Sequence, residues 1–393
     1  MIVPEFLPTS VTVAMTANPL LAMVAAPLFL SAGLVPLVLQ ADTLLQQEAL
    51  HPLDVLDPAG WNRSHEWLVD APIEKEYCLK AVESSTSTDA ASVAEHAAGR
   101  WRTLRRHGSV QSVTLMEPRC NFDDADDDEE TLVPFHASVG NEYLKVMASA
   151  YAALSHPDGG ISSSQSKTNT KTLHLGLGGG TLPMLIGEPC TAIELDQDAV
   201  DLAIAYCGLD PELVSIVRGG DALHHRTLVP TPHGGDGGST SGYSCIFVDV
   251  FDHTNNVPTP FVEEEFIRGL YESLDEETGG LVIANFHCHG PNKKEDVMLQ
   301  QATRMYARVF NHNKNNHVGG LNNGSNNENN NNELSCVLRI PSRYQGNMIV
   351  CARKGGTLSP PTEVDRERAR QVATTKGWMF DPGTRLYPAE TIS

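Results

Sequence analysis

The sequence is short of positive charge. Its 393 residues contain 28 lysines and arginines against 49 aspartates and glutamates, which leaves a net charge of -21 with neutral histidines. A chain this acidic is repelled by phosphate backbones, and no basic patch is visible that would offset the repulsion. We therefore expect no nucleic acid among its partners or substrates.

Closely spaced cysteines are also absent. The eight cysteines are scattered without any C-x-x-C pair, and most lie in or beside apolar runs. This pattern is typical of buried free thiols in a reducing compartment. The even count leaves disulfides open as an alternative.

Charge is missing altogether from residues 6–40, and Leu20–Leu39 is long enough to span a bilayer. Prolines interrupt this segment, and no lysine or arginine precedes Arg63. Neither the basic start of a signal peptide nor a positive-inside flank is therefore present. The sequence leaves open an anchor or targeting segment, with membrane contact through residues 11–40, a buried or disordered extension, and a misassigned start.

Composition and periodicity divide the chain into four predicted regions. The first is the hydrophobic segment 1–40, and the second is a small flanking region, 41–170, with a hairpin near 109–115, an acidic loop at 123–130 and a Gly/Ser/Thr-rich connector at 158–170. The third is a ligand-binding domain at 171–353, with a disordered asparagine-rich insertion at 311–332. The fourth is a C-terminal tail at 354–393.

Residues 171–353 alternate between short apolar runs and segments of helical length, which predicts an α/β fold with a parallel sheet. The predicted strands span 172–176, 191–195, 214–218, 244–250 and 281–286. The predicted helices span 198–206, 261–274 and 293–310, and amphipathic helices flank the domain at 141–154 and 362–375. Two β-rich runs, 336–340 and 347–351, predict a C-terminal β-hairpin beside the five parallel strands.

A glycine-rich turn follows the first of these strands. The run Thr172-Leu-His-Leu-Gly-Leu-Gly-Gly-Gly-Thr181 has no Cβ atom at four of its positions, so its backbone can approach a ligand closely. One βα unit later, Glu194 ends the second strand, where a carboxylate can accept from both hydroxyls of a ribose. The fingerprint of nicotinamide and flavin proteins, G-x-G-x-x-G, would need a glycine in place of Thr181. What remains is closer to the loop G-x-G-x-G that holds S-adenosylmethionine, through Gly176, Gly178 and Gly180.

Polar residues follow the other strands, at the edge of the sheet where ligands bind in folds of this type. One of Glu194 and Asp196 should contact the ribose, and the other should be the N-cap of the next helix. After the third strand, Asp221 can accept from an adenine amino group while the backbone of Ala222 contacts the ring edge. The alternative for Asp221 is a turn cap.

The fourth and fifth strands end in the residues that we predict to act on the substrate. Asp249 and Asp252 can bind an amine cation and take its proton, although Asp252 can also be a purely structural loop cap. Asn285 ends the fifth strand as a polar group that faces the reacting centre. His287 and His289 follow it, but no further ligand accompanies them, so we predict no metal site.

These motifs resemble a known family. The runs Gly176–Met184, Ile193–Asp196, Gly220–Ala222, Val248–Asp252 and Phe261–Phe266 look like the spermidine-synthase-like branch of class I S-adenosylmethionine-dependent methyltransferases. Within that branch they are most similar to the methyltransferase-like 13 group, and the resemblance covers roughly residues 105–352. It implies a seven-stranded sheet, with the three glycines at the methionine moiety, Glu194 at the ribose and Asp221 at the adenine. It also makes Gln111 a possible cofactor or substrate contact.

The resemblance brings a rival reaction. Polyamine-forming aminopropyltransferases share the fold and use a D-x-x-D pair like Asp249 and Asp252, together with a carboxylate inside the glycine loop. Here that loop position is Gly179, and His253 stands where the rival pattern continues into proline. Loss of one carboxylate that holds the amine costs about 2 to 4 kcal/mol of transition-state binding, so methyl transfer is favoured.

The sequence thus predicts an S-adenosylmethionine-dependent methyltransferase that acts on a nitrogen of a protein or small amine. Polyamine aminopropyl transfer and a non-catalytic S-adenosylmethionine-binding module are the alternatives. We expect a cytoplasmic catalytic domain, unless the N-terminal segment places it at a membrane or in an organelle. The acceptor, the catalytic competence and the oligomeric state are not predicted.

Overall fold

The computed structural model describes residues 73–78, 91–96, 101–106, 109–118, 132–155, 171–228, 242–253, 256–276, 279–287, 297–318, 335–342, 346–386 and 389–392. All of them belong to one compact unit, Ala59–Ser393. The hydrophobic N-terminal segment, the acidic loop and the connector at 158–170 lie outside the described residues. Within these ranges, no helix combines the length and the apolar character needed to cross a bilayer.

The flanking region contains a five-stranded antiparallel sheet, which is more than the hairpin that the sequence predicted. Its strands, in spatial order, are β1 (Ile73–Cys78), β2 (Ser92–His96), β3 (Trp101–Arg106), β4 (Ser109–Pro118) and β5 (Leu132–Val139). Val93, Leu104 and Val113 are buried, whereas most of β1 is exposed. Strands β1 to β3 are five or six residues long, and β1 and β3 each contain three charged residues, so their apolar alternation was too weak to predict them. The uncharged strand β5 contains a proline, Pro134, and was not predicted either.

The main sheet has eight strands in the order β13-β11-β12-β10-β9-β6-β7-β8. They are β6 (Thr172–Leu175), β7 (Cys190–Glu194), β8 (Val214–Arg218), β9 (Cys245–Val248), β10 (Leu281–His287), β11 (Val337–Pro341), β12 (Asn347–Arg353) and β13 (Glu390–Ile392). Neighbours from β8 to β10 pair in parallel, and β12, β11 and β13 continue the sheet with antiparallel pairing. The sheet is therefore mixed, and β13 is an eighth strand that the sequence did not predict.

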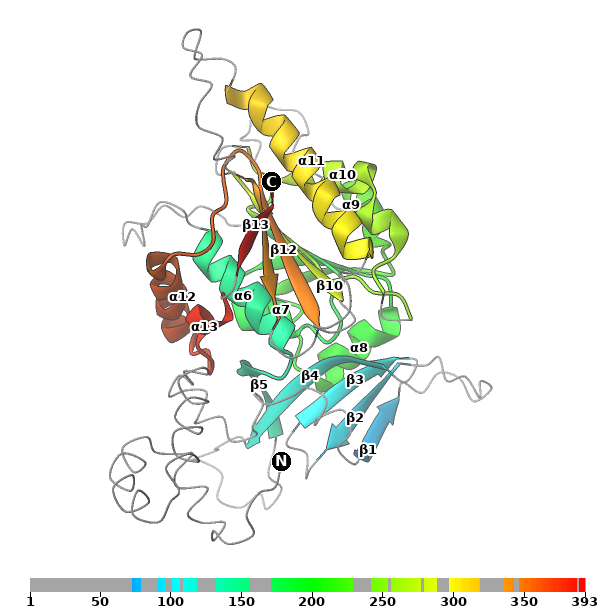
Figure 1. Ribbon diagram of the computed structural model, residues 1–393. Helices are drawn as coiled ribbons and strands as arrows, with labels where there is room; N and C mark the ends of the chain where they lie inside the picture. Colours follow the sequence, from blue (N-terminus) through cyan, green and yellow to red (C-terminus); the bar gives the residue numbers. More distant parts are fainter. Residues whose placement is uncertain are drawn as a thin grey trace, which may run out of the picture. The chain divides into compact units, whose positions relative to one another are not determined.

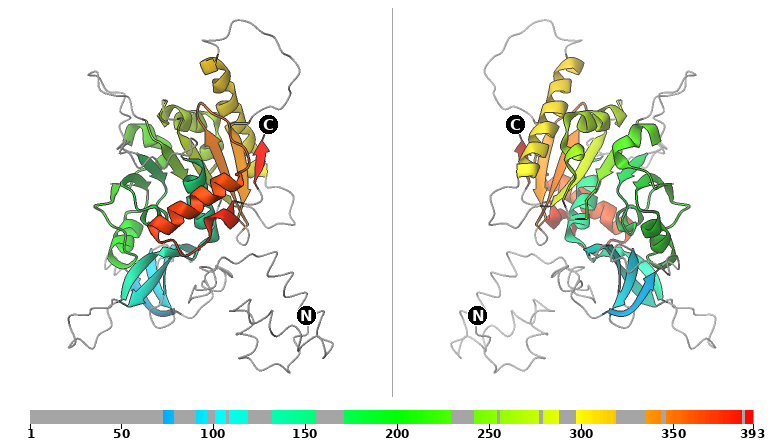
Figure 2. Two further views of the ribbon diagram at one scale, coloured as in Figure 1. Left: turned by 90° about the vertical axis from the view of Figure 1, so that its left-hand side faces the viewer. Right: turned by 90° about the vertical axis from the view of Figure 1, so that its right-hand side faces the viewer.

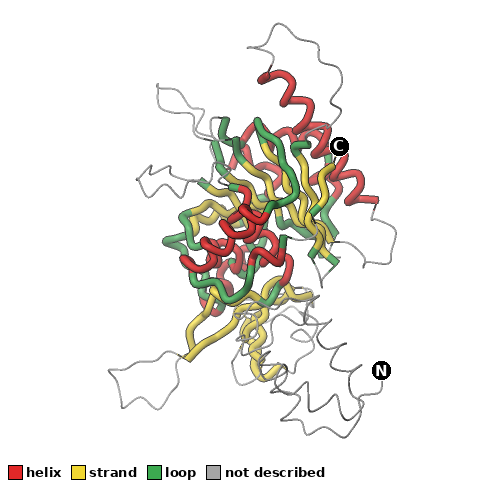
Figure 3. Tube along the Cα trace, turned by 60° about the vertical axis from the view of Figure 1, so that its left-hand side comes forward, coloured by secondary structure: helices red, strands yellow, loops and turns green. Residues whose placement is uncertain are grey.

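Helices cover both faces of the main sheet (Figures 1 and 2). On one face lie α6 (Glu142–Leu154) and α12 (Glu363–Lys376), and on the other α10 (Glu264–Ser273) and α11 (Val297–Val318). Successive side chains of β9 point to opposite faces of the sheet. Phe247 therefore packs on the α6 side and Ile246 on the α10 side. The remaining helical segments are α7 (Thr181–Ile186), α8 (Gln197–Tyr206), η1 (Ala222–His224), α9 (His225–Leu228), η2 (Thr259–Val262) and α13 (Pro382–Arg385). Figure 3 shows the helices gathered around this sheet.

Two helix predictions need correction. The single helix expected at 261–274 is divided at Glu263, whose extended backbone separates η2 from α10. The asparagine-rich insertion was predicted to begin at residue 311, but α11 continues through Val318. A helix gains one backbone hydrogen bond for each residue added, so it can extend past the end of its apolar stripe. Residues 319–332 lie outside the described residues.

C-terminal residues are hydrogen-bonded to α7, the helix that follows the glycine turn. The Trp378 indole N–H donates to the Leu185 carbonyl at 2.9 Å, and the Lys376 ammonium donates to the Ile186 carbonyl at 2.6 Å. These two carbonyls belong to the last turn of α7, where backbone acceptors have no partner within the helix. The boundary predicted at residue 354 stays a prediction.

Candidate functional site

A cavity of about 520 Å³ lies at the carboxyl ends of the parallel strands, where the sequence predicted a site. One side, called here the glycine-loop side, is lined by Gly176, Gly178, Glu194, Asp196, Asp221 and Ala222. The opposite side, called the Asp249 side, is lined by Tyr143, Asp249, Asp252, Asn285 and Asn347. Residues of β4 complete the wall. Of the site residues predicted from the sequence, only Gly180 does not line the cavity.

The glycine turn has the backbone that the sequence implied. Gly176, Gly178 and Gly180 have φ angles of +83°, +52° and +75°. At Gly176 the chain also passes very close to β9, since an added Cβ would lie 2.9 Å from the carbonyl carbon of Asp249. Glycine is therefore required there by packing as well as by backbone angle. Gly180 acts behind the cavity, as the left-handed N-cap of α7.

Glu194 holds the glycine turn in place. Its Oε2 accepts from the backbone N–H groups of Leu177 at 2.8 Å and Gly178 at 3.3 Å, and its Oε1 accepts from Asp196 N–H at 2.9 Å. A carboxylate has about four acceptor sites, so about one remains for a ligand. A ribose held through both hydroxyls would therefore have to displace the longer bond from Gly178. The predicted ribose contact stays a prediction.

Asp196 is the N-cap of α8, as predicted for one of the two acids. Its Oδ1 accepts from the backbone N–H groups of Asp198 and Ala199 at 3.1 and 3.2 Å. The other oxygen, Oδ2, lies 2.9 Å from Nε of Arg106 in β3. This ion pair connects the flanking sheet to the rim of the cavity, and no pattern in the sequence indicated Arg106.

Asp221 has the capping role that the sequence left open. Its Oδ1 accepts from the backbone N–H of Leu223 at 3.0 Å and caps η1. The second carboxylate oxygen is not used by that cap. Ala222 is buried and lines the cavity beside Asp221, so neither predicted adenine contact conflicts with the geometry.

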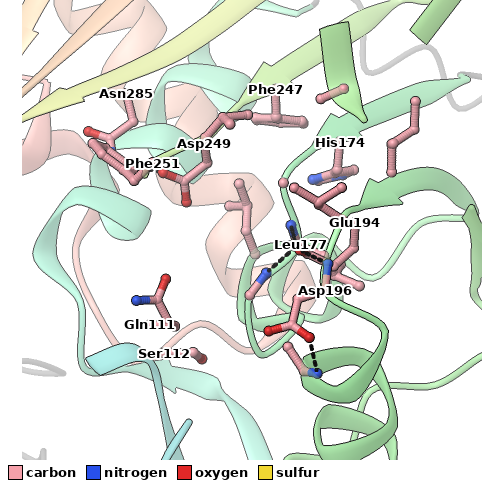
Figure 4. Close-up of a pocket in the computed structure, with 18 of the residues that line it drawn as sticks. Gln111, Ser112, His174, Leu177, Glu194, Asp196, Phe247, Asp249, Phe251 and Asn285 are labelled. Carbon is pink, nitrogen blue, oxygen red and sulfur yellow. Dashed lines mark hydrogen bonds between the residues drawn. The ribbon is translucent and has the colours of Figure 1, made fainter. Parts of the chain in front are cut away.

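On the Asp249 side, hydrogen bonds join four side chains, which come from α6, β10, β12 and the loop after β9. Asn285 Nδ2 donates to Asp249 Oδ1 at 2.9 Å, and Asn347 Nδ2 donates to Asn285 Oδ1 at 3.0 Å. The Tyr143 hydroxyl, from the first turn of α6, also hydrogen-bonds to Asp249. Figure 4 shows Asp249 and Asn285 together, with Gln111 and Ser112 of β4 across the cavity.

The ionisation of Asp249 is shifted by its surroundings. Burial raises the pKa of its carboxyl from 3.8 to about 6, although the bonds from Asn285 and Tyr143 act in the opposite direction and Glu194 adds to the rise. Burial also raises the pKa of the Tyr143 hydroxyl well above its usual value, so this hydroxyl remains a donor. A carboxyl that titrates near pH 6 at the wall of a cavity is a candidate for proton transfer.

Asp252 has the structural role that the sequence listed as an alternative. Its Oδ1 accepts from the backbone N–H of Asn256 at 3.1 Å, and its own N–H donates to the Asn256 carbonyl at 2.9 Å. These bonds close the loop after β9. The side chain still lines the cavity beside Asp249, so the predicted contact with a substrate cation stays a prediction.

The β4 wall meets the glycine turn at Gly179. An added Cβ on Gly179 would lie 2.7 Å from the Cβ of Ser112, closer than real Cβ contacts. The Ser112 hydroxyl is also hydrogen-bonded to the Thr181 hydroxyl at 2.8 Å, and both residues are buried. Ser112 is thus fixed where a side chain at position 179 would have to go. Gln111, beside it, lines the cavity as the family resemblance implied.

Sequence reasoning missed Tyr143, Asn347, Ser112 and Arg106 as cavity residues. Tyr143 stands at the start of a helix that was predicted, and Asn347 at the start of a strand that was predicted, but neither prediction indicates which residue the element faces. His287 lines the cavity, whereas Cys288 and His289 lie outside the described residues. Within the part of the chain that is described, no three His, Cys, Asp or Glu residues are grouped to hold a metal ion.

Known proteins resemble this chain in structure and not in sequence. No protein-family model matches the sequence, and no curated protein matches it. A probable spermidine synthase from Corynebacterium glutamicum is 17% identical with a TM-score of 0.48, over 77% of this chain and 87% of that chain. Human methyltransferase-like protein 13, solved in complex with SAH, is 19% identical with a TM-score of 0.44, over 60% and 93%. Spermidine synthase from Thermotoga maritima is 16% identical with a TM-score of 0.42, over 73% and 77%. The chain is thus similar to the two groups that its motifs resemble.

Proposed function

We propose that this chain is an S-adenosylmethionine-dependent methyltransferase that methylates a nitrogen of a protein or small amine. The cofactor is proposed because the cavity fits it on several counts. The turn from Gly176 to Gly178 removes Cβ atoms where the methionine end would lie, and Glu194 keeps about one acceptor site for a ribose hydroxyl. Asp221 keeps an oxygen for the adenine amino group.

The observation that favours methyl over aminopropyl transfer is the contact between Gly179 and Ser112. Aminopropyl transfer, in the family that the motifs resemble, uses a carboxylate at this loop position. Here the backbone passes so close to β4 that even a Cβ would lie 2.7 Å from Ser112 Cβ. The site thus lacks that acid and has no room for it. A cofactor that keeps its own carboxylate meets no negative charge from this part of the loop.

The Asp249 side would act on the acceptor. The bound cofactor supplies a methyl carbon activated by its sulfonium, and an acceptor nitrogen needs a free lone pair to attack it. Asp249, ionised above about pH 6, would hold an acceptor ammonium and take its proton. Asn285 and Tyr143 fix the carboxylate by hydrogen bonds from two sides. The chain otherwise contributes alignment and exclusion of water.

Aminopropyl transfer remains a second candidate because Asp249 and Asp252 line the same cavity, three residues apart in sequence, as in the D-x-x-D pair of that family. Two residues disfavour aminopropyl transfer: Gly179, where that family has a carboxylate, and His253, where its pattern has a proline. The two reactions differ in the cofactor that they use. Aminopropyl transfer requires decarboxylated S-adenosylmethionine, whereas methyl transfer requires the intact form.

Label transfer tests the proposal. The full-length chain is incubated with a cell lysate and S-adenosylmethionine labelled on its methyl group, and Asp249→Asn serves as the matched control. We expect label in protein or in small amines with the wild type, and far less with the variant. Cofactor binding without any labelled product across several lysates would instead support a non-catalytic binding module.

A further inference from the structure

Asn347 reaches the cavity from a part of the chain distant in sequence. It is the first residue of β12 and pairs in register with His287 at the end of β10. Its carbonyl accepts from the Ser342 N–H at 2.8 Å, which closes the hairpin between β11 and β12. Its side chain is 8% exposed and turns toward Asn285, so the hairpin delivers one amide to the Asp249 side of the cavity.

The hydrogen bond from Asn347 determines which end of the Asn285 amide faces Asp249. A side-chain amide has one donor end and one acceptor end, and rotation about its last bond exchanges them. Asn347 donates to the oxygen of Asn285, so the nitrogen of Asn285 faces the carboxylate. In the opposite orientation two oxygens would face each other. Asn285 is only 2% exposed, so bulk water cannot easily replace the lost bond.

We propose that Asn347 is a positioning residue, which fixes the Asn285 amide so that Asp249 is held in its ionised, proton-accepting form. The role of Asn347 in catalysis rests on the proposed methyl transfer, in which Asp249 takes the proton of the acceptor. The orientation itself rests only on the two hydrogen bonds.

The charge of Asp249 depends on pH, and several groups set it together. Burial raises its pKa, and the amide of Asn285 opposes that rise. Other titratable groups also line this cavity: Tyr143 on α6, His174 on β6, Glu194 on β7, His287 on β10, and Asp252 and His253 on the loop after β9. Burial lowers the pKa of His174 to about 3, so its ring stays neutral. Replacement of Asn347 acts on Asp249 through the Asn285 amide, whose oxygen loses its donor.

The sharpest variant is Asn347→Asp. It is nearly isosteric, but a carboxylate can only accept, so it forces the Asn285 amide to rotate and present its oxygen to Asp249. The rotated amide and the added negative charge both disfavour ionised Asp249, so we expect the pH midpoint for its ionisation to rise by about one unit, a tenfold change in proton affinity. Asn347→Leu removes the donor without adding charge, and a smaller rise is expected. If the first variant does not fold, the second carries the test.

The measurement is the thermal unfolding midpoint of the full chain between about pH 4 and pH 8, in a double-mutant cycle with Asp249→Asn. The wild type should lose stability as Asp249 ionises, and Asn347→Asp should move that loss to higher pH. In the Asp249→Asn background, Asn347→Leu, which brings no titratable group of its own, should cause no shift. If Asn347 is merely structural, Asn347→Leu should lower the unfolding midpoint without moving the pH at which stability is lost.

A matched control is Asn311→Asp, which adds the same charge elsewhere. The Asn311 Oδ1 accepts from the Cys336 N–H at 3.0 Å, and a carboxylate can keep that bond. No shift in the pH midpoint is expected there. The proposal is overturned if Asn347→Leu and the wild type lose stability at the same pH, or if the shift caused by Asn347→Leu persists without Asp249. Because the cycle needs no turnover, it separates this proposal from the proposed function, which cofactor titration of the same samples tests.

Discussion

The two sides of the cavity are built in different ways. The glycine-loop side is made mainly from consecutive backbone, with Gly176 and Gly178 at positive φ and one carboxylate that accepts from the backbone N–H groups of Leu177 and Gly178. The Asp249 side is made from single side chains that α6, β10 and β12 bring together from more than 200 residues of chain, Tyr143 to Asn347. A site made of consecutive backbone leaves a motif in the sequence. A site made of distant side chains does not.

The largest expected effect is on the glycine-loop side. Gly176→Ala should abolish measurable cofactor binding in an isothermal titration, because the added Cβ would lie 2.9 Å from the carbonyl carbon of Asp249 at a φ of +83°. Gly355→Ala is the matched control, since Gly355 has a φ of +73° with no atom near its Cβ position. It should lose only the stability attributable to backbone strain, about 1 to 3 kcal/mol. Equal cofactor affinity in the two variants would contradict the packing argument.

The next largest effect is on the Asp249 side. Asp249→Asn should lower the rate of methyl transfer by about 100-fold or more, with cofactor affinity nearly unchanged. Its effect on stability has a defined sign. The pKa of Asp249 is raised in the folded chain, from 3.8 to about 6, so its contribution to stability is present below pH 3.8 and is lost as pH rises through about 6.

The variant should therefore gain stability relative to the wild type between those pH values, by up to about 3 kcal/mol. The amide can satisfy both neighbours, because it can accept from Asn285 and donate to the Tyr143 oxygen. Unfolding followed at pH 4 and pH 7 checks the sign. A difference between variant and wild type that does not change with pH would show that Asp249 is not the titrating group.

A smaller effect is expected where the β4 wall meets the glycine turn. Gly179→Ala should weaken cofactor binding because its Cβ meets Ser112, and Ser112→Gly in the same chain should restore part of the loss. The coupling between the two substitutions should be about 0.5 to 3 kcal/mol. Strictly additive effects on binding would mean that Ser112 does not limit the space at position 179.

The smallest effect is expected at the rim. Arg106 pairs with Asp196 at 2.9 Å, but its side chain is 38% exposed. Ion pairs in such positions contribute about 0 to 1 kcal/mol, so Arg106→Ala should change stability and cofactor affinity little. Unfolding and titration at low and high salt check this. A large loss of affinity would mean that Arg106 contacts the ligand directly.

The sequence predicted the architecture of the main sheet better than its edges. Strands β9 and β10 had nearly continuous apolar runs, because both of their faces are buried. The short strand β13 and the charged strands of the flanking sheet carry no such run, and they form only through pairing with strands that are already present. Local pattern could therefore not predict them.

The candidate site divides in the same way. Gly176, Glu194 and Asp221 could be predicted from spacing, because each lies at the end of a strand or within three residues after it, and the neighbours of these strands in the sheet follow from the fold. Asn347 and Ser112 could not, since their positions depend on the register of β12 against β10 and on the approach of β4 to the glycine turn. Asp252 and Glu194 also have structural roles, which are seen only in their hydrogen bonds: Asp252 accepts from Asn256 in the loop after β9, and Glu194 accepts from Leu177 in the glycine turn.

The most direct test of the central claim is an isothermal titration of the folded full-length chain with S-adenosylmethionine and with its decarboxylated form. The glycine-loop side, with no acid at position 179, should bind the intact cofactor and bind it more tightly than the decarboxylated one. The account would be contradicted by no measurable binding of the intact cofactor in a folded sample, or by tighter binding of the decarboxylated form.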